Sequence, residues 1–163
     1  MPKRILSPVP VVDLFAGPGG LGEGFSAYPL DADSRFSISL SIEKEEWAHR
    51  TLLLRSFYRL FPGGEVPDDY YSHLRGDISQ EELFARYPVQ AETARRQSLC
   101  LEIRPSNRRK IRQAIADRVA GRPAWILIGG PPCQAYSVIG RSRMIGADRR
   151  LKTNKYWGRR GRV

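Results

Sequence analysis

Apolar and polar residues alternate along the chain with two periods, one typical of strands and one typical of helices. Residues 9–15 form a short apolar run, and residues 36–42 alternate like a half-buried strand. Residues 45–60 follow a helical spacing, with an apolar stripe that includes Trp47, Leu54, Phe57 and Tyr58. We therefore expect a strand, a glycine-rich turn that leads into a helix, a second strand and a second helix.

Two further helices are expected in the middle of the chain. Ser79 and Glu82 have the spacing of a capping box at the start of a short helix, which follows a polar connection at residues 65–77. Residues 90–104 favour a longer helix. That helix would contain Cys100, for which a small buried side chain is the simplest interpretation.

The next segments complete an alternation of strands and helices. Ser106 is expected to cap a helix that runs through Ala120, with an apolar face of Ile111, Ile115 and Val119. Residues 124–128, AWILI, are the strongest strand pattern in the chain. Such alternation predicts an α/β fold with a largely parallel sheet. The loops that follow the strands should then meet at one edge of that sheet, where ligands of such folds collect.

Length and composition are those of a single soluble domain. The chain has 163 residues, of which 41% are hydrophobic and 27% are charged. No apolar run approaches the roughly 20 residues of a membrane span, and the first residues do not resemble a signal peptide. Cys100 and Cys133 are too few for a disulfide framework or a zinc site, so a reducing, cytoplasmic setting is expected.

Positive charge is concentrated near the carboxyl end. Residues 141–163 hold nine basic side chains and one acid, or +8, whereas the other 140 residues hold 18 basic and 16 acidic side chains, or +2. A basic segment can contact phosphate backbones, but blocks of like charge are also often solvated and disordered. The pattern divides the chain into a domain at residues 1–146 and a basic tail at residues 147–163.

The glycine-rich turn has the spacing of a nucleotide site. Gly17, Gly19 and Gly22 satisfy G-x-G-x-x-G, a helix is expected from about Gly20, and Glu43 follows 21 residues after Gly22. Glycines permit close approach of a ligand, and an acid on the next strand can bind ribose hydroxyls. The spacing alone fits NAD, FAD or S-adenosylmethionine, and also a turn without a ligand.

Two neighbouring residues favour S-adenosylmethionine. Asp13 ends the first strand, where a carboxylate would repel a pyrophosphate but attract the ammonium group of a methionine moiety. Phe15 follows it and can lie against an adenine ring.

Cys133 is the candidate nucleophile. It lies in the segment GGPPCQAYS after the last expected strand, where Pro131 and Pro132 stiffen the backbone. A reactive cysteine must be largely thiolate, and Arg141 and Arg143 are the nearest cations in the sequence. His49 and His73 have no partners at metal or triad spacing, and no metal site is expected.

The segments DLFAGPGGLGEGF and GGPPCQ resemble two motifs of the DNA cytosine-5 methyltransferases. The resemblance extends over residues 9–146 and implies a Rossmann-like methyltransferase fold. It also implies binding of S-adenosylmethionine, through Asp13, Phe15, Gly17, Gly19, Gly20, Glu43, Trp47, Asp77 and Pro131. Asp77 would accept from the adenine amino group, although about 50 residues separate GDI at 76–78 from GGPPCQ, more than is usual in the family.

The same resemblance implies a mechanism. The target cytosine leaves the duplex, the Cys133 thiolate adds to C6, and C5 takes the methyl group from S-adenosylmethionine. Loss of the C5 proton and of the cysteine completes the reaction. Contacts to DNA are expected from Gln134, Ser137, Arg141 and Arg143.

The later motifs of that family are not found in this sequence. The Glu-Asn-Val motif, an Arg motif and the target recognition domain are missing, which predicts a truncated product or one half of a split enzyme completed by a second chain. Little methyl transfer is expected from this chain alone. Two other functions remain open: an NAD-binding Rossmann oxidoreductase, and a non-catalytic DNA-binding remnant that uses its basic tail.

Overall fold

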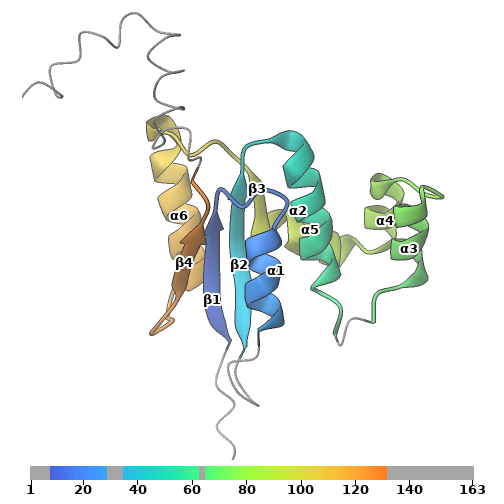
Figure 1. The fold of residues 1–163 in the computed structure, drawn as a ribbon, viewed down its shortest axis with the longest axis horizontal. Coiled ribbons are helices and arrows are strands. Elements are labelled where there is room, and N and C mark those ends of the chain that lie inside the picture. The colour runs from blue at the N-terminus through green and yellow to red at the C-terminus, as the bar shows by residue number, and fades with distance from the viewer. Residues whose placement is uncertain (1–7, 29–34, 63–64, 132–163) are drawn as a thin grey trace, which may run out of the picture. The chain divides into compact units, whose positions relative to one another are not determined.

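The computed structural model describes residues 8–28, 35–62 and 65–131 of the chain. Residues Met1–Gly130 form one compact unit, which contains all the described residues except Pro131. Within the described residues of this unit, four parallel strands form one sheet in the order β3-β2-β1-β4 (Figure 1). The strands are β1 Val9–Leu14, β2 Phe36–Glu43, β3 Ser98–Cys100 and β4 Ile126–Gly129. The expected α/β fold with a parallel sheet is confirmed.

Helices cover both faces of the sheet. The helix α1 (Gly20–Ala27) lies in front of the sheet in Figure 1, and α6 (Arg108–Val119) lies behind it. Successive residues of β1 point to opposite faces. Val12 therefore packs with Ile111 of α6, while Asp13 faces Gly22 of α1.

A second apolar cluster joins the helices that follow β2. These are α2 (Glu46–Tyr58), α3 (Asp68–Arg75), α4 (Gln80–Arg86) and α5 (Pro88–Gln97). The buried members of the cluster are Phe57, Tyr70, Leu83, Phe84, Ala91 and Ala94. Two ring pairs, Phe57 with Phe84 and Tyr58 with Tyr70, have centroids 5.0 and 5.3 Å apart. These contacts hold α3 and α4 to α2 and α5.

Local signals correctly predicted several of these elements. The capping box at the start of α4 is present: Ser79 Oγ accepts from Glu82 N at 3.0 Å, and Ser79 N donates to Glu82 Oε2 at 2.7 Å. The apolar face expected on the last helix is also present, because Ile111 is buried and Ile115 and Val119 pack beside it.

Four expectations were wrong in part. Residues 65–77 contain α3, whose core contact is Tyr70, rather than only a polar connection. Helix α5 ends at Gln97, and Cys100 lies exposed in β3 because parallel pairing with β2 takes over there. Ser106 caps no helix, since a short 3-10 turn precedes α6. Trp47 is 71% exposed, so it does not belong to the buried stripe of α2.

No helix among the described residues has the length and apolar character that crossing a bilayer requires.

Candidate cofactor site at the carboxyl ends of the strands

Glu43 joins the glycine-rich loop to the start of α2. It is the last residue of β2, and its Oε2 accepts from Gly17 N at 2.8 Å. Its Oε1 accepts from Lys44 N and Glu45 N, each at 2.8 Å. The parallel topology thus brings together the Gly loop and the acid that the sequence analysis connected. Oε1 already accepts two hydrogen bonds, whereas Oε2 accepts one and keeps lone-pair capacity for a further donor such as a hydroxyl.

The loop itself requires glycine at two positions. Gly19 has φ +91°, and a Cβ there would lie 2.9 Å from Leu52 Cδ1, so the Leu52 side chain would have to shift. Gly17 also has a positive φ of +57°, but an added Cβ would meet nothing within 4 Å. The same openness is found at Gly20. The loop is therefore fixed on its inner side and open on its outer side, where a ligand can approach the backbone.

Two aromatic side chains are exposed at this edge. Phe15 directly follows β1 and is 36% exposed, and its φ of +58° is unusual for a residue with a side chain. Such backbone strain is often retained at ligand sites. Trp47, in the first turn of α2, has its ring 5.3 Å from the Arg50 guanidinium. Both rings offer a face on which a planar base can stack.

Asp13 is buried behind the loop and lacks a full hydrogen bond. It is 1% exposed, and neither carboxylate oxygen has a partner among the described residues. Burial raises the pKa of Asp13 to about 6, while the nearby positive charge of Arg59 lowers it. The Gly22 N–H also lowers this pKa, although it does not complete a hydrogen bond. An orphaned buried carboxylate beside a Gly loop fits a cationic group better than a phosphate.

A polar row crosses the sheet at the level of Asp13. Asp13 pairs with Ser41 in the neighbouring strand, and Ser41 pairs with Ser98 in the next. All three residues are at most 3% exposed, and the Ser41 hydroxyl, like the Asp13 carboxylate, has no partner among the described residues. This row lies on the same sheet face as α1.

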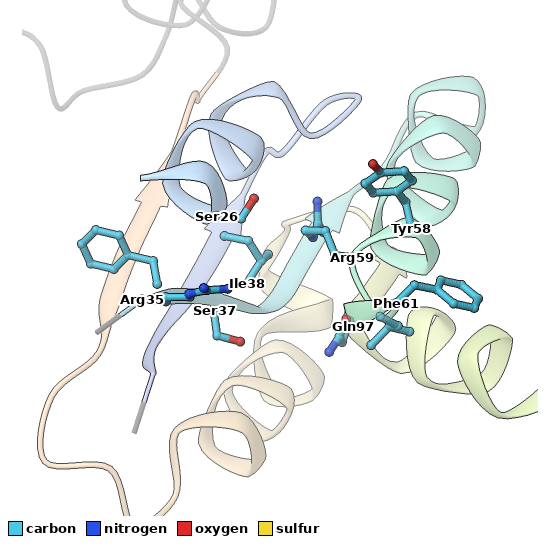
Figure 2. A pocket seen from close by; sticks show the side chains of 10 residues that line it. Ser26, Arg35, Ser37, Ile38, Tyr58, Arg59, Phe61 and Gln97 are labelled. Atoms are coloured by element: carbon cyan, nitrogen blue, oxygen red, sulfur yellow. The ribbon is translucent and has the colours of Figure 1, made fainter. Parts of the chain in front are cut away.

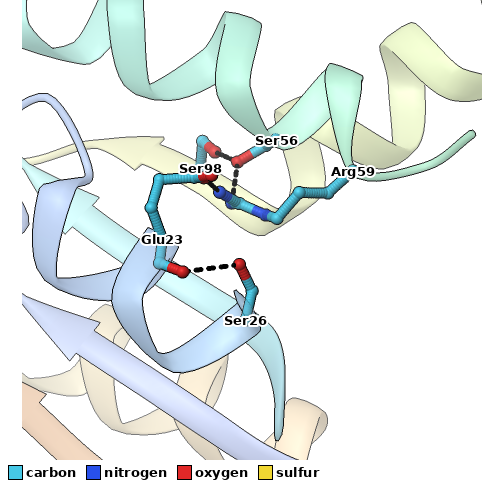
Figure 3. Close-up of polar contacts among 5 residues, drawn as sticks. All are labelled: Glu23, Ser26, Ser56, Arg59 and Ser98. Carbon is cyan, nitrogen blue, oxygen red and sulfur yellow. Dashed lines mark hydrogen bonds and ion pairs between the residues drawn. The ribbon is translucent and has the colours of Figure 1, made fainter. Parts of the chain in front are cut away.

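Arg59 connects that row to the helices above it (Figure 3). Its guanidinium forms an ion pair with Glu23 of α1 and donates to Ser56 Oγ at 2.9 Å. Ser56 Oγ in turn lies 2.7 Å from Ser98 Oγ. Burial lowers the pKa of Arg59, and the Glu23 carboxylate raises it. The sequence analysis missed this network, because Arg59 and Glu23 are 36 residues apart and no local pattern connects them.

The end of β4 lies beside the end of β1. Leu14 pairs with Gly129, and a Cβ on Gly129 would lie 2.2 Å from the Leu14 carbonyl oxygen, so only glycine fits. Pro131 is the last described residue and is exposed. The remaining predicted site residues lie outside the described residues: Cys133, Gln134, Ser137, Arg141 and Arg143. The basic tail at 147–163 lies outside them as well.

Asp77 is not brought to this edge. It lies between α3 and α4, which Figure 1 shows beyond α2 and α5 as seen from β1, and its carboxylate accepts from Arg75 Nε at 3.1 Å. The acid that follows β3 is instead Glu102. Leu101 N donates to the Glu43 carbonyl at 2.8 Å, so Glu102 follows directly on the end of that strand pair. Sequence reasoning missed it because it placed 90–104 in a helix.

A hollow of about 520 Å³ opens at the other end of β2 (Figure 2). Its lining includes Arg35, Phe36, Tyr58, Phe61 and Gln97. Phe36 begins β2 and Glu43 ends it, so the hollow lies at the amino end of the strand. Ligands of parallel sheets gather at the carboxyl ends, and we therefore assign the candidate site to the Gly loop.

The described residues contain no group of three or more His, Cys, Asp or Glu that is placed to hold a metal ion. His49 Nε2 lies 3.0 Å from the Ser98 carbonyl oxygen, and His73 Nδ1 lies 3.1 Å from that of Ile78. Both histidines thus contact the backbone of neighbouring segments.

The chain matches no protein-family profile and no solved structure. It is 34% identical, over 91% of its length, to the Type II methyltransferase M.Bpa9945I of Bacillus paralicheniformis. The chain spans 37% of the length of that protein. The four-stranded parallel sheet with helices on both faces is consistent with the Rossmann-like fold of a methyltransferase.

Proposed function

We propose that the chain is part of the catalytic domain of a DNA (cytosine-5-)-methyltransferase that uses S-adenosylmethionine. The observation that carries the proposal is the hydrogen bond from Gly17 N to Glu43, which joins a Gly turn and an acid at one sheet edge. The similarity to a Type II methyltransferase supports the same reading. Cytosine-5 specificity comes from the resemblance of GGPPCQ to the family's catalytic motif.

Each described residue of the site has a place in cofactor binding. Gly17, Gly19 and Gly20 form the turn that lets the ligand approach, and Glu43 accepts from ribose hydroxyls. The adenine ring lies between aromatic side chains supplied by Phe15 and Trp47. When bound, S-adenosylmethionine supplies an electrophilic methyl group next to a positively charged sulfur.

Asp13 has a different task in this scheme. Its carboxylate is buried, carries no full hydrogen bond and has a raised pKa. A cationic ligand group beside it would restore the ionised form. The carboxylate therefore selects for the positively charged methionine end and against a pyrophosphate, which disfavours NAD.

Cys133 performs the attack on the base. Its thiolate adds to C6 of a flipped cytosine, which makes C5 nucleophilic and ready to take the methyl group. Loss of the C5 proton then expels the thiolate and restores the ring. Pro131 contacts the cofactor, and Gln134, Ser137, Arg141 and Arg143 contact DNA.

Calorimetric titration of the full chain with S-adenosylmethionine and, separately, with NAD tests the proposal. We expect the chain to bind S-adenosylmethionine and not NAD. Glu43→Gln should weaken this binding at least tenfold, which corresponds to about 1.4 kcal/mol of binding free energy. Glu46→Gln is the matched control, because Glu46 is an exposed acid in the first turn of α2, three residues after Glu43. Preferential binding of NAD, or equal effects of the two substitutions, would contradict the proposal.

Duplex DNA with 5-fluorocytosine in place of cytosine tests the nucleophile. With S-adenosylmethionine present, fluorine stands in place of the C5 proton that must leave after methyl transfer, so each turnover ends in a trapped covalent adduct. Such an adduct should accumulate even at the low rate expected of this chain alone, and it should depend on Cys133. Cys100→Ser is the matched control and should leave the adduct unchanged, whereas Cys133→Ser should abolish it. An adduct that survives Cys133→Ser would rule out this residue.

A further inference from the structure

Helix α6 and the residues that flank it carry a concentration of positive charge, although the net charge of the domain is small. Residues 104–122 contain seven basic side chains and one acid, Asp117. The basic residues are Arg104, Arg108, Arg109, Lys110, Arg112, Arg118 and Arg122. The 140 residues that precede the basic segment sum to only +2, yet this stretch alone contributes +6.

The fold places three of these charges on the outer side of the helix. The inner side of α6 packs through Ile111, Ile115 and Val119 against the sheet. Arg108, Arg109 and Arg112 are exposed. Together with Ser106 and Gln113, among others, they line a hollow of about 630 Å³. We refer to Arg108, Arg109 and Arg112 as the α6 basic surface.

Two neighbouring cations, Arg104 and Arg118, have partners, but among the described residues the arginines of the α6 basic surface have none. Arg104 pairs with Glu102 at 3.2 Å, and Arg118 donates to the Arg96 carbonyl at 2.7 Å. Asp117, the one acid of the stretch, accepts from Gln113 at 2.7 Å. Within the part of the chain that the structure describes, no salt bridge or side-chain hydrogen bond involves the three arginines of the surface.

Three guanidinium groups within two turns of helix repel one another. Other helices of the same chain avoid this, because Arg96 of α5 pairs with Glu92 and Arg75 of α3 pairs with Asp77. A polyanion that lies across α6 would offset the repulsion. Its oxygens would also accept paired hydrogen bonds from the guanidinium groups.

We propose that the α6 basic surface binds the phosphodiester backbone of double-stranded DNA, in addition to the catalytic contacts. The other residues that line the hollow are Pro105, Ser106, Gln113 and Ala116. They lack the large apolar side chains that a membrane-binding helix inserts into lipid. A contact through phosphates is independent of sequence, so it would position flanking DNA rather than read the target.

The choice of DNA as the polyanion rests on the proposed function, whereas the α6 basic surface itself does not. The surface lies on α6, which covers the sheet face opposite α1 and the polar row. DNA binding by α6 and cofactor binding at the Gly loop can therefore be measured separately.

The test is the salt dependence of DNA binding by the full chain. Fluorescence anisotropy with a labelled 30-base-pair duplex is recorded over a series of NaCl concentrations for the wild type and for Arg108→Gln/Arg109→Gln/Arg112→Gln. The matched control is Arg75→Gln/Arg86→Gln/Arg96→Gln, which removes the same charge from arginines that already pair with acids. Each lost phosphate contact should reduce the slope of log K against log salt by about 0.9.

We expect the α6 triple variant to lose roughly two to three units of slope, and the control to lose less than one. Arg108→Lys/Arg109→Lys/Arg112→Lys keeps the charge and should retain most of the slope. Equal slopes in the α6 variant and the control would overturn the inference. Loss of binding to phosphatidylserine vesicles with unchanged DNA binding would also overturn it.

Calorimetric titration with S-adenosylmethionine separates this inference from the proposed function. The α6 triple variant should bind the cofactor as the wild type does. If the wild type and all variants fail to bind the cofactor, the proposed function is rejected. The α6 inference still holds in that case if the salt slope of DNA binding depends on the three arginines.

Discussion

At the level of Asp13, the two faces of the sheet are built from different kinds of residue. Leu40 and Ser41 are consecutive in β2, and each is 1% exposed. Leu40 packs with Val12 and Ile111 on the α6 side, whereas Ser41 lies between Asp13 and Ser98 in a polar row on the α1 side. Burying polar groups without full hydrogen bonding costs free energy. The apolar contacts on the α6 face therefore stabilise the fold, whereas the buried polar groups on the α1 face lower the free energy of unfolding near the proposed cofactor site.

Truncation of the apolar face should have the largest effect. Leu40→Ala is expected to lower the free energy of unfolding by about 2–5 kcal/mol, because it leaves a cavity in the cluster on α6. Ser41→Ala removes a hydroxyl without a partner, so it should change stability by less than about 1 kcal/mol. Urea unfolding followed by circular dichroism measures both. Similar losses for the two variants would mean that the faces do not differ as described.

Removal of the buried cation should have the next largest effect. Arg59→Met leaves Glu23 without its partner, and we expect a loss of about 2 kcal/mol, less than for a fully buried pair because Glu23 is partly exposed. Arg86→Met is the control; its ion pair with Asp69 is more exposed and should be worth less than about 1 kcal/mol. A double variant with Glu23→Gln should recover part of the loss. No recovery would indicate that Arg59 acts mainly through its side-chain contacts rather than its charge.

The raised pKa of Asp13 predicts a specific pH dependence. The folded pKa of about 6 lies above the ordinary value of 3.8, so the folded protein binds the extra proton between these values. Stability should therefore fall as pH rises from about 4 to about 6, by on the order of 1–3 kcal/mol, and stay low above that range.

Asp13→Asn should remove this segment of the pH profile and raise stability at pH 7. The same substitution should weaken S-adenosylmethionine binding, since the cationic end of the ligand loses its counter-charge. Unfolding curves at pH 4, 5, 6 and 7 with parallel calorimetric titrations measure both effects. If Asp13→Asn leaves the pH profile of stability unchanged, a group other than Asp13 causes the pH dependence.

The smallest effect concerns which acid, Glu102 or Asp77, would contact the adenine in the proposed site. Glu102→Gln should weaken S-adenosylmethionine binding a few-fold, because Glu102 follows the end of β3 next to the last residue of β2. Asp77→Asn should weaken it less, since Asp77 lies between α3 and α4. Calorimetric titrations of the two variants decide between them. A larger loss in Asp77→Asn would favour the role that the family resemblance gave to Asp77.

Local signals account for the elements that the sequence predicted well. The strands β1 and β2 follow from short apolar runs, the Gly loop from its glycines, and the start of α4 from Ser79 and Glu82. The meeting of Gly17 and Glu43 also followed, because parallel strands end at the same edge. These features depend on residues that are close in sequence or on topology alone.

Other features depended on contacts between distant segments. Residues 98–100 become a strand only through pairing with β2, and α3 is held through Tyr70 against neighbouring helices. The burial of Arg59 requires Glu23 and Ser56 from two different helices. None of these partners can be identified from the spacing of apolar positions.

The sequence by itself determined the alternation of strands and helices, the glycine-rich loop and Cys133 as the candidate nucleophile, whose role stays a prediction. Only the tertiary structure decided that Asp13 is buried without a full hydrogen bond and that the arginines of α6 share one exposed surface. The physical reason is the sequence separation over which the interactions act. Backbone propensity and periodicity act over a few residues, whereas burial, pKa and charge clustering depend on which segments the fold places together.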